Sequence, residues 1–335
     1  MKNIYKMFIC FIISSIVFVL AIGIGSVFIQ PTETINILLY KIFNFKFMDI
    51  DEKILSIIWK IRLPRVLLAF VCGAGLSLSG TIIQSILKNA LASSYTLGVS
   101  SGAGLGASLC LLFNIYIFGV FSMQIFGFIF GITTVFMAIT IATKLDKTMQ
   151  NNAIILTGMA FSMFANAMLS IVMTFAKEDL QNIVFWQMGS FAMKDKVYIP
   201  LLYAIVFIVF ILVFLKHKEM DILTFGDEQA SLTGVEVKKT KIFLLVMSSL
   251  LTGFIVSVVG VIGFIDLFTP HITRKIFGSN HKYALFMSLI LGGTFMVLCD
   301  LVARTIASPV ELPVGAITSI IGAPFFVYLY FDKRK

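Results

Sequence analysis

Three arginines near predicted helix ends could bind carboxylates. Arg62 and Arg65 flank Pro64, and Arg304 follows Asp300 by four residues, on one helical face. A guanidinium forms forked, charge-assisted hydrogen bonds with carboxylates and keeps its proton. We therefore expect Arg62, Arg65 and Arg304 to form an outward cationic cluster with few acids nearby. The alternative is that Arg62 and Arg65 anchor their helix to lipid headgroups.

A second set of polar residues lies in the longest polar stretch between apolar runs that we assign to the cytoplasm, 216–241. A glycine breaks the chain there, two acids follow, and a short helix continues; its residues include Gly226, Asp227, Glu228, Ala230, Leu232 and Gly234. Acids in the first turn favour the positive end of the helix dipole. A helix this short is marginal in water, so we expect it to rest on the membrane domain or on a partner protein.

Two polar side chains lie inside predicted membrane spans. Gln84 is in the inner part of the 64–86 run, where an amide normally faces another helix or a water-filled path. Asp266 interrupts the apolar 262–277 run, with no basic residue within a helical turn. An isolated charge in hydrocarbon is too costly, so we expect Asp266 to face a water-accessible cavity or a mobile helix junction. The alternative is a helix end in contact with water.

Several chemistries have no residues to support them. The chain has no GxxxxGK[ST] motif, so we expect no nucleotide hydrolysis by this chain alone. No Ser/His/Asp or paired-carboxylate arrangement recurs on one helix. No metal site and no cofactor is expected, because CxxC and HxxxH clusters are missing among Cys10, Cys72, Cys110, Cys299, His217, His271 and His281.

The elements that must position these residues follow from the composition. Hydrophobic residues make up 59% of the 335 residues and charged residues 13%, whereas soluble domains average about 45–50% and 25%. A soluble protein and a nucleic-acid-binding chain are excluded, despite the net charge of +9. We predict an all-α, polytopic membrane protein forming a single domain, 1–335, with ten helices at about 8–29, 64–86, 95–113, 115–143, 153–176, 197–215, 241–261, 262–277, 283–302 and 309–331.

Small residues repeated every four positions predict where these helices touch. The 64–86 run carries one such face and the next run carries another; their residues are Gly73, Ser77, Thr81, Gly98, Gly102 and Gly106. Small residues at this spacing let helix backbones approach closely in lipid. We therefore expect tight packing within one bundle.

Lysines and arginines predict the orientation of the chain. With the N-terminus in the cytoplasm, most basic residues fall in cytoplasmic loops or at the two ends of the chain. Most of the others lie in one long segment, 31–65, where the rule is weaker. We therefore expect both termini in the cytoplasm, consistent with an even number of spans.

In their order and spacing, the polar segments resemble the FecCD-type family of bacterial permeases, the membrane subunits of ABC importers for iron–siderophores, haem and cobalamin. The segments that carry the resemblance are Arg62-Leu63-Pro64-Arg65, Gln84 to Ala92, Leu97 to Ala103, Trp186 with Gly189-Ser190, Gly226 to Gly234, Gly263 to Arg274 and Glu311 to Pro324. The resemblance implies a type II ABC importer permease fold in a bacterial cell membrane. It implies import driven by a separate ATPase, with an iron–siderophore as first cargo, haem second and cobalamin third.

The resemblance also implies partners and residue roles. Two permease subunits, identical or related, would pair along the substrate path, with two cytoplasmic ATPase subunits below and an extracytoplasmic substrate-binding protein above. The three outer arginines occupy positions that receive acidic residues of that binding protein. The 226–234 helix corresponds to the coupling helix that fits a cleft in the ATPase. Asn89 and Leu91 match positions near the cytoplasmic gate, and we add Gln84 and Asp266 to the expected path or gate.

This sequence departs from the family pattern at a few positions. Ala90 and Ser94 stand where proline is usual, so we expect a less rigid inner turn after the second span. Asp266 stands where glycine is usual, and glycine is what allows a close helix approach. Lys88 replaces a common arginine, which changes little.

Two other classes of protein fit the sequence less well. An ion-coupled secondary transporter would have a similar number of spans, but it would hold ionisable residues at mid-membrane, for which Asp266 is the one candidate. A membrane-embedded enzyme would need a cluster of His, Asp or Ser within the spans, which the sequence lacks. ATP dependence of uptake in reconstituted vesicles separates the permease from the secondary transporter.

Overall fold

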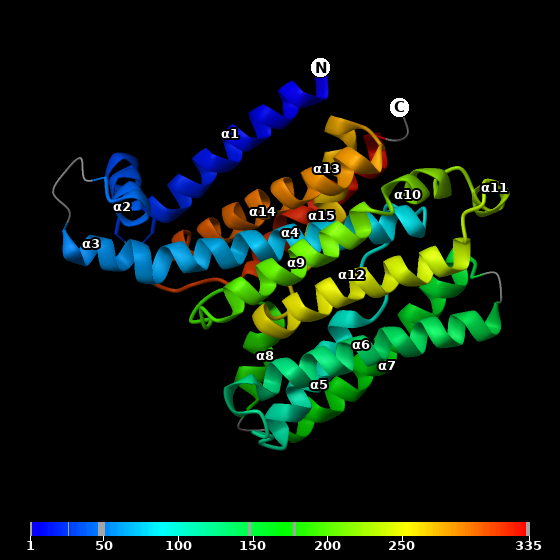
Figure 1. The fold of residues 1–335 in the computed structure, drawn as a ribbon. Helices are drawn as coiled ribbons and strands as arrows, with labels where there is room; N and C mark the ends of the chain where they lie inside the picture. The colour runs from blue at the N-terminus through cyan, green and yellow to red at the C-terminus, as the bar shows by residue number, and fades with distance from the viewer. Residues whose placement is uncertain (1, 26, 46–50, 147–148, 177–178, 333–335) are drawn as a thin grey trace.

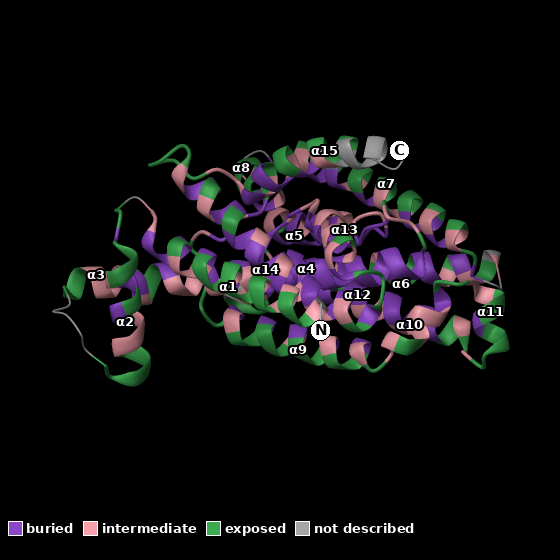
Figure 2. Cartoon of the chain, turned by 90° about the horizontal axis from the view of Figure 1, so that it is seen from above, coloured by how far each residue is buried: buried purple, intermediate pink, exposed green. Residues whose placement is uncertain are grey.

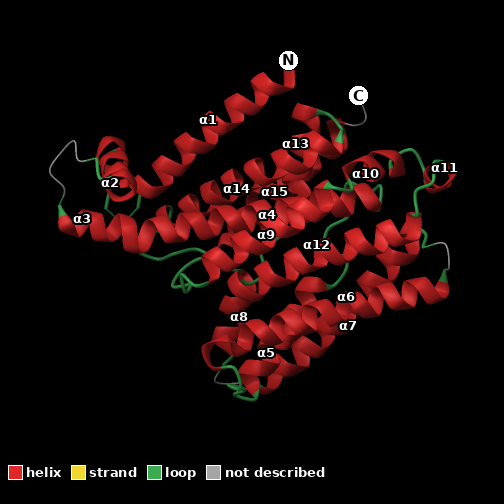
Figure 3. Ribbon diagram, viewed as in Figure 1, coloured by secondary structure: helices red, strands yellow, loops and turns green. Residues whose placement is uncertain are grey.

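The computed structural model describes residues 2–25, 27–45, 51–146, 149–176 and 179–332, and all regular secondary structure in these ranges is helical (Figures 1 and 3). Ten helices lie at the ten predicted apolar runs, which confirms the all-α prediction: α1 Lys2–Gly23, α4 Leu63–Ile86, α5 Val99–Leu112, α6 Ser122–Leu145, α7 Asn151–Phe175, α9 Tyr198–Phe214, α12 Val237–Val259, α13 Ile265–Phe277, α14 His281–Thr305 and α15 Val314–Asp332. Several basic residues of the orientation argument lie outside the described ranges: Lys46, Lys147, Lys177, Lys333, Arg334 and Lys335.

Shorter elements occupy the connections. They are α2 Pro31–Phe43, α3 Glu52–Ser56, the π-helical turn η1 Ile57–Arg62, the 3-10 turn η2 Gly119–Phe121, α8 Leu180–Met188, α10 His217–Leu223 and α11 Asp227–Leu232. The helix predicted after Gly226 is α11. The chain bends by 58° between α9 and α10, so α10 and α11 leave the direction of the membrane-length helices (Figure 1).

The helices differ in how much of a bilayer they could cross. Within the described residues, six are long and apolar enough, at Asn3–Gly23, Glu52–Ile86, Ser122–Lys144, Asn151–Phe175, Val237–Val259 and His281–Thr305, and counting the bent pair α9–α10 as one span gives at most seven. With 14 and 13 residues, α5 and α13 reach only about 20 Å, against a hydrocarbon core of about 30 Å. Each follows an irregular segment, 87–98 or 260–264. Such backbone is tolerated at membrane depth where protein surrounds it.

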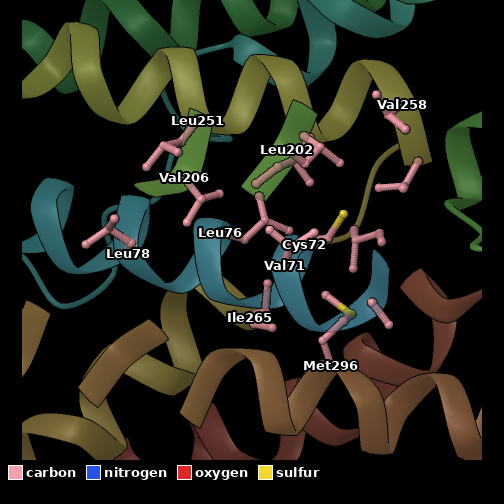
Figure 4. Close-up of a cluster of buried hydrophobic side chains, with 14 of the residues drawn as sticks. Val71, Cys72, Leu76, Leu78, Leu202, Val206, Leu251, Val258, Ile265 and Met296 are labelled. Atoms are coloured by element: carbon pink, nitrogen blue, oxygen red, sulfur yellow. The ribbon is translucent and has the colours of Figure 1, made fainter. Parts of the chain in front are cut away.

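Helix α4 lies at the centre of the bundle (Figure 2). In the continuous helical stretch that contains it, 89% of the apolar window is buried, against 22% for α1. Figure 4 shows Val71, Cys72 and Leu76 meeting side chains from α9, α12, α13 and α14. Because other helices surround α4, its polar residues must find protein partners rather than lipid or water.

Glycines let two neighbours approach α4 at backbone distance. A Cβ at Gly73 would overlap the carbonyl oxygen of Gly292 in α14, and a Cβ at Gly80 would overlap the carbonyl oxygen of Asp266 in α13. In the α5–α6 pair, a Cβ at Gly102 would come within 2.8 Å of the Phe130 carbonyl oxygen. The predicted close faces around Gly73 and Gly102 are therefore confirmed.

These contacts predict that two Gly→Ala changes in helices shift Tm in opposite directions: Gly73→Ala should lower it and Gly104→Ala should raise it. Gly73→Ala should lower Tm in detergent, because relieving the overlap costs about 1–3 kcal/mol, more than the gain of roughly 1 kcal/mol in helix propensity. Gly104→Ala is the matched control, since its Cβ would meet only Leu169 and Trp186 side-chain atoms at 3.7 and 3.9 Å. Equal Tm values for the two variants would contradict this account of the α4–α14 contact.

Candidate docking, gating and coupling sites

Two of the three predicted docking arginines bind the end of α1. Arg62 Nη1 donates to the carbonyl oxygens of Ile22 and Gly23, at 3.0 and 2.6 Å. Its Nη2 donates to the carbonyl oxygen of Val27 at 2.5 Å. Arg304 donates to the carbonyl oxygen of Ala21. The last carbonyls of a helix have no partner inside it, and cations suit that end of the dipole. The guanidiniums of Arg62 and Arg304 therefore donate hydrogen bonds to the last carbonyl oxygens of α1.

The predicted outward cationic cluster with few acids is thus wrong in its geometry. The side chains of Arg62 and Arg304 are buried, at 5% and 8% exposure. Arg65 binds two carboxylates: its Nη2 lies 2.8 Å from Asp300 Oδ1, and its Nη1 lies 2.8 Å from Glu311 Oε1. The acids that neutralise Arg65 come from α14 and the segment before α15, so tertiary packing brings them in.

Lysines that our docking prediction left out line a cavity beside Arg65. It has a volume of about 260 Å³ and lies between the start of α4 and the loop before α9; its lining includes Lys60, Lys194 and Lys196. Lys60 and Lys196 are exposed, whereas Lys194 is half-buried. Burial lowers the pKa of the Lys194 ammonium. The exposed positive charge at this end of α4 therefore resides on lysines.

On the opposite side, Asp227 fixes α11 to the membrane-length helices. Its carboxylate lies 3.1 Å from Lys88 Nζ, just after α4, and 2.5 Å from Lys241 Nζ in the first turns of α12. Lys241 is fully buried and also donates to Asn151 Oδ1 at 2.9 Å. Burial opposes ionisation of Asp227, but the hydrogen bonds and charges of Lys241 and Lys88 outweigh it and hold its pKa below the ordinary value. The Asp227 carboxylate is therefore bound by lysines of the permease itself.

The other predicted coupling residues divide between the two faces of α11. Ala230 is fully buried, whereas Glu228 is exposed. Leu232, at the end of α11, is 88% exposed, and Phe225, just before it, is 75% exposed. Gly226 and Gly234 have φ values of 136° and 86°, so glycine turns bound the helix on both sides. Phe225 was not among the predicted residues; its place beside the chain-breaking glycine is the signal that could have found it.

Gln84 connects α4 to α13. Its Nε2 donates to the carbonyl oxygens of Asp266 and Leu267, at 3.2 and 3.3 Å, and its Oε1 accepts from Arg274. The prediction that this amide faces another helix is confirmed. Two residues of the expected gate follow in the next turn; the side chain of Asn89 accepts from the backbone N–H of Leu91 at 2.9 Å, and Leu91 is 61% exposed.

Asp266 does not face a water-accessible cavity. It is fully buried in the first turn of α13, and its Oδ2 accepts the backbone N–H of Ser94 at 3.1 Å. Ser94 Oγ lies 2.6 Å from Ser79 Oγ, which in turn lies 2.9 Å from the Thr252 hydroxyl. A proline at 94 could make neither contact. The turn expected to be less rigid is therefore hydrogen-bonded directly to α13 and α4, and through Ser79 to α12, and two departures from the family pattern touch each other.

A hydrogen-bonded set that our sequence analysis missed lies near α11. Ser85, Asp221 and His281 come from α4, α10 and α14, and they meet through the two ring nitrogens of His281. We looked for Ser, His and Asp on one helix, whereas the bundle assembles them from three. Asp221 lies five residues before Gly226. This proximity to the predicted coupling residues is the signal that could have identified it.

Comparison with known proteins decides the family. A sequence model of the FecCD transport family matches residues 12–332. The chain belongs to the FecCD transport family. It is 33% identical over 319 residues to the Fe(3+)-citrate import system permease protein YfmE of Bacillus subtilis, covering 95% of this chain and 92% of YfmE. It is 31% identical over 320 residues to the molybdate import system permease protein MolB of Haemophilus influenzae, with coverage of 95% and 92%.

A solved structure agrees over the whole length. The FecCD chain superposes on a metal-chelate type ABC transporter in an inward-facing conformation with a TM-score of 0.85 and 28% identity, covering 98% of this chain and 99% of that chain. The resemblance and the all-α permease fold are therefore confirmed. The protein is a multi-pass ABC importer permease, a transporter subunit rather than an enzyme.

The contact between Ser94 and Asp266 predicts that their effects on stability are coupled. Ser94→Pro should destabilise the FecCD permease by about 1–3 kcal/mol, because it leaves a buried carboxylate oxygen without its donor. In an Asp266→Gly background the same change should cost clearly less, since no carboxylate is left unpaired. Thermal unfolding of the two single variants and the double variant completes the cycle.

Ser94→Ala is the control for that cycle, because it keeps the backbone N–H and removes only the hydroxyl. Its cost should be the same in both backgrounds. An equal cost of Ser94→Pro with and without Asp266 would show that the hydrogen bond contributes nothing.

Proposed function

We propose that this permease imports an iron complex, driven by a separate cytoplasmic ATPase. The observation that carries the proposal is the construction of α11, a helix of six residues that Asp227 fixes to two lysines of its own chain while Leu232 stands 88% exposed. Phe225, just before the helix, is 75% exposed, and two exposed apolar side chains on a short, anchored segment suit contact with another protein. Family membership supports an ATPase as that protein.

In this proposal the coupling residues have different tasks. Asp227 and Ala230 hold α11 against the permease, and Gly226 and Gly234 form the turns at its ends. Glu228 and Leu232, together with Phe225, present the surface that enters the ATPase. The exposed apolar side chains supply contact area, and the acid at the first turn suits the helix dipole.

We also propose that the substrate-binding protein docks on the outer ends of α4 and α14. Arg62 and Arg304 hold the end of α1 in place beneath that surface, and Arg65 fixes the Asp300 and Glu311 carboxylates. Lys60 and Lys196 are the exposed cations beside Arg65, so acidic residues of a binding protein would meet these lysines first. The three arginines then support the docking surface from within.

A second permease subunit, identical or related, is proposed to pack along α7. Asn166 and Ser170 are exposed on this helix, and Asn166 lies about 22 Å along it. A carboxamide exposed at that depth is costly against lipid, and it favours a neighbouring helix or a water-filled path. We place the substrate path beside this face, with Gln84, Asn89, Leu91 and Asp266 supporting its cytoplasmic gate.

The orientation follows from the same assignment. With α11 and Lys88 at the ATPase side, both termini are proposed to lie in the cytoplasm of a bacterial cell. The outer arginines and lysines then face the binding protein. Each permease in the dimer would bind one ATPase subunit.

The cargo assignment rests on relatives. YfmE is named for Fe(3+)-citrate import, which supports an iron complex, and iron–siderophore stays our first choice, with haem and cobalamin next. MolB is named for molybdate import, so the same fold also serves an oxyanion. The relevant comparison is therefore among a ferric chelate, haem, cobalamin and molybdate.

Reconstitution of the complete complex with its binding protein tests the proposal. Proteoliposomes should take up a radio-iron chelate only when ATP is enclosed with the ATPase, and haem, cobalamin and molybdate should be taken up more slowly. Uptake driven by an ion gradient without ATP would instead indicate a secondary transporter. Faster uptake of molybdate than of any iron chelate would overturn the cargo assignment.

The exposed surface of α11 predicts a separable coupling defect. Leu232→Glu should reduce co-purification of the ATPase and lower uptake at least about tenfold, because it places a charge in an apolar contact. Affinity for the binding protein should be unchanged. Lys239→Gln is the control, since Lys239 is exposed and, within the described part of the chain, its ion pair is with Glu236. Wild-type ATPase binding by Leu232→Glu would show that α11 does not form this contact.

A further inference from the structure

Ser85, His281 and Asp221 form a continuous chain of hydrogen bonds across three helices. His281 Nε2 lies 2.6 Å from Ser85 Oγ, and His281 Nδ1 lies 2.6 Å from Asp221 Oδ1. The backbone N–H of His281 donates to the same Asp221 oxygen at 2.9 Å. Ser85 and His281 are buried, at 8% and 3% exposure. The chain therefore joins the last turn of α4 to the first turn of α14 and to α10.

The hydrogen-bond directions follow from the groups. An ionised Asp221 can only accept, so His281 Nδ1–H donates to it, and Nε2 of the neutral ring accepts from the Ser85 hydroxyl. Asp221 also places a negative charge at the N-terminus of α14, where the helix dipole favours it. Each polar atom of the His281 ring thus has a partner. A ring fixed at both nitrogens holds its two neighbours at a set separation.

The same end of α4 has a second connection to the cytoplasmic helices. Lys88 pairs with Asp227 of α11, and both side chains are about one-third exposed. Pairs that water reaches contribute little, whereas buried hydrogen-bond networks reinforce one another. In the route through His281, Ser85 and His281 are buried and Asp221 is about one-third exposed, so water reaches only its α10 end.

The backbone between α10 and α11 also favours a role for α10. Only residues 224–226 separate the two helices, and α10 packs against α4, α11 and α14. A push on α11 therefore reaches α10 through three residues and then meets His281. One residue before Ser85, Gln84 binds α13, so a shift of this turn would also reach the inner gate.

We propose that Ser85, His281 and Asp221 are positioning residues that transmit movement of the coupling segment, α10 and α11, to the inner end of α4. The inference rests on the proposed function, because it takes α11 as the ATPase contact. The inference adds α10 to the coupling segment and identifies the side chains that connect α10 to the inner end of α4. Ser85 is a buried residue of α4, so the three residues act through each other and not on a substrate.

The test uses the complete complex in proteoliposomes and measures uptake and ATP hydrolysis together. Ser85→Ala removes one hydrogen bond at the α4 end, and Asp221→Asn weakens the α10 end. Each should lower the ratio of uptake to hydrolysis by about two- to tenfold, the range expected for the loss of one hydrogen bond. The double variant should be no worse than the more impaired single variant, because both changes break one chain.

Two variants make the result specific. Ser77→Ala removes a hydroxyl two turns earlier in the same helix, and Ser77 Oγ is buried without a hydrogen-bond partner among the described residues; its ratio should match the wild type. Ser85→Thr keeps a hydroxyl and should restore coupling. Tm and co-purification of the ATPase should stay near wild type in every variant.

Three outcomes would overturn the inference. The first is an unchanged ratio in Ser85→Ala and Asp221→Asn with the complex intact. The second is loss of Tm, hydrolysis and uptake in equal proportion, which would show a purely structural contact. The third is additive effects in the double variant. Absence of ATP-driven uptake by the wild-type complex is a different result, since it refutes the proposed function itself.

Discussion

The need to pair buried polar groups without water governs much of this fold. Helix α4 is surrounded by other helices, so its polar side chains can bond only with protein. The carbonyls that end α1 meet the same requirement and receive Arg62 and Arg304. Residues 92–94 of the irregular segment 87–98 are buried beside α4, where Ser94 bonds to Ser79, because irregular backbone at membrane depth is tolerated where protein encloses it. The two ends of α4 are consequently the places where charged residues gather.

This constraint links the two ends of the permease through one central helix. Near its N-terminus, Arg65 joins α4 to α14 through Asp300. Along its length, Gly73 and Gly80 place it in backbone contact with α14 and α13. Near its C-terminus, Gln84 binds α13 and Ser85 meets His281. Since α4 has few ways to move independently of α13 and α14, a displacement at one end is passed to its neighbours.

The sequence predicts the helices well because hydropathy and small-residue spacing are local signals. Ten apolar runs became ten helices, and the Gly73 and Gly102 faces pack as expected. The direction of Arg62 and Arg304 could not be predicted, because it depends on where α1 ends relative to α4 and α14. The partners of Asp227 could not be predicted either, since Lys88 lies 139 residues before it and Lys241 14 residues after it. Polar contacts assembled from separate segments, unlike the small-residue faces, leave no signal in local spacing.

Ser94 and Asp266 show this limit most clearly. Taken singly, each residue is unfavourable: serine loses the rigidity of proline, and a carboxylate crowds a position where glycine is usual. Together they contact each other, since the N–H that proline lacks binds the carboxylate that glycine lacks. The hydroxyl of Ser94 adds a bond to Ser79, so fixed backbone dihedrals are replaced by hydrogen bonds to α13 and α4. A hydrogen bond can break and re-form, whereas a proline ring keeps its φ angle fixed, and a turn held in this way can therefore be both ordered and able to rearrange.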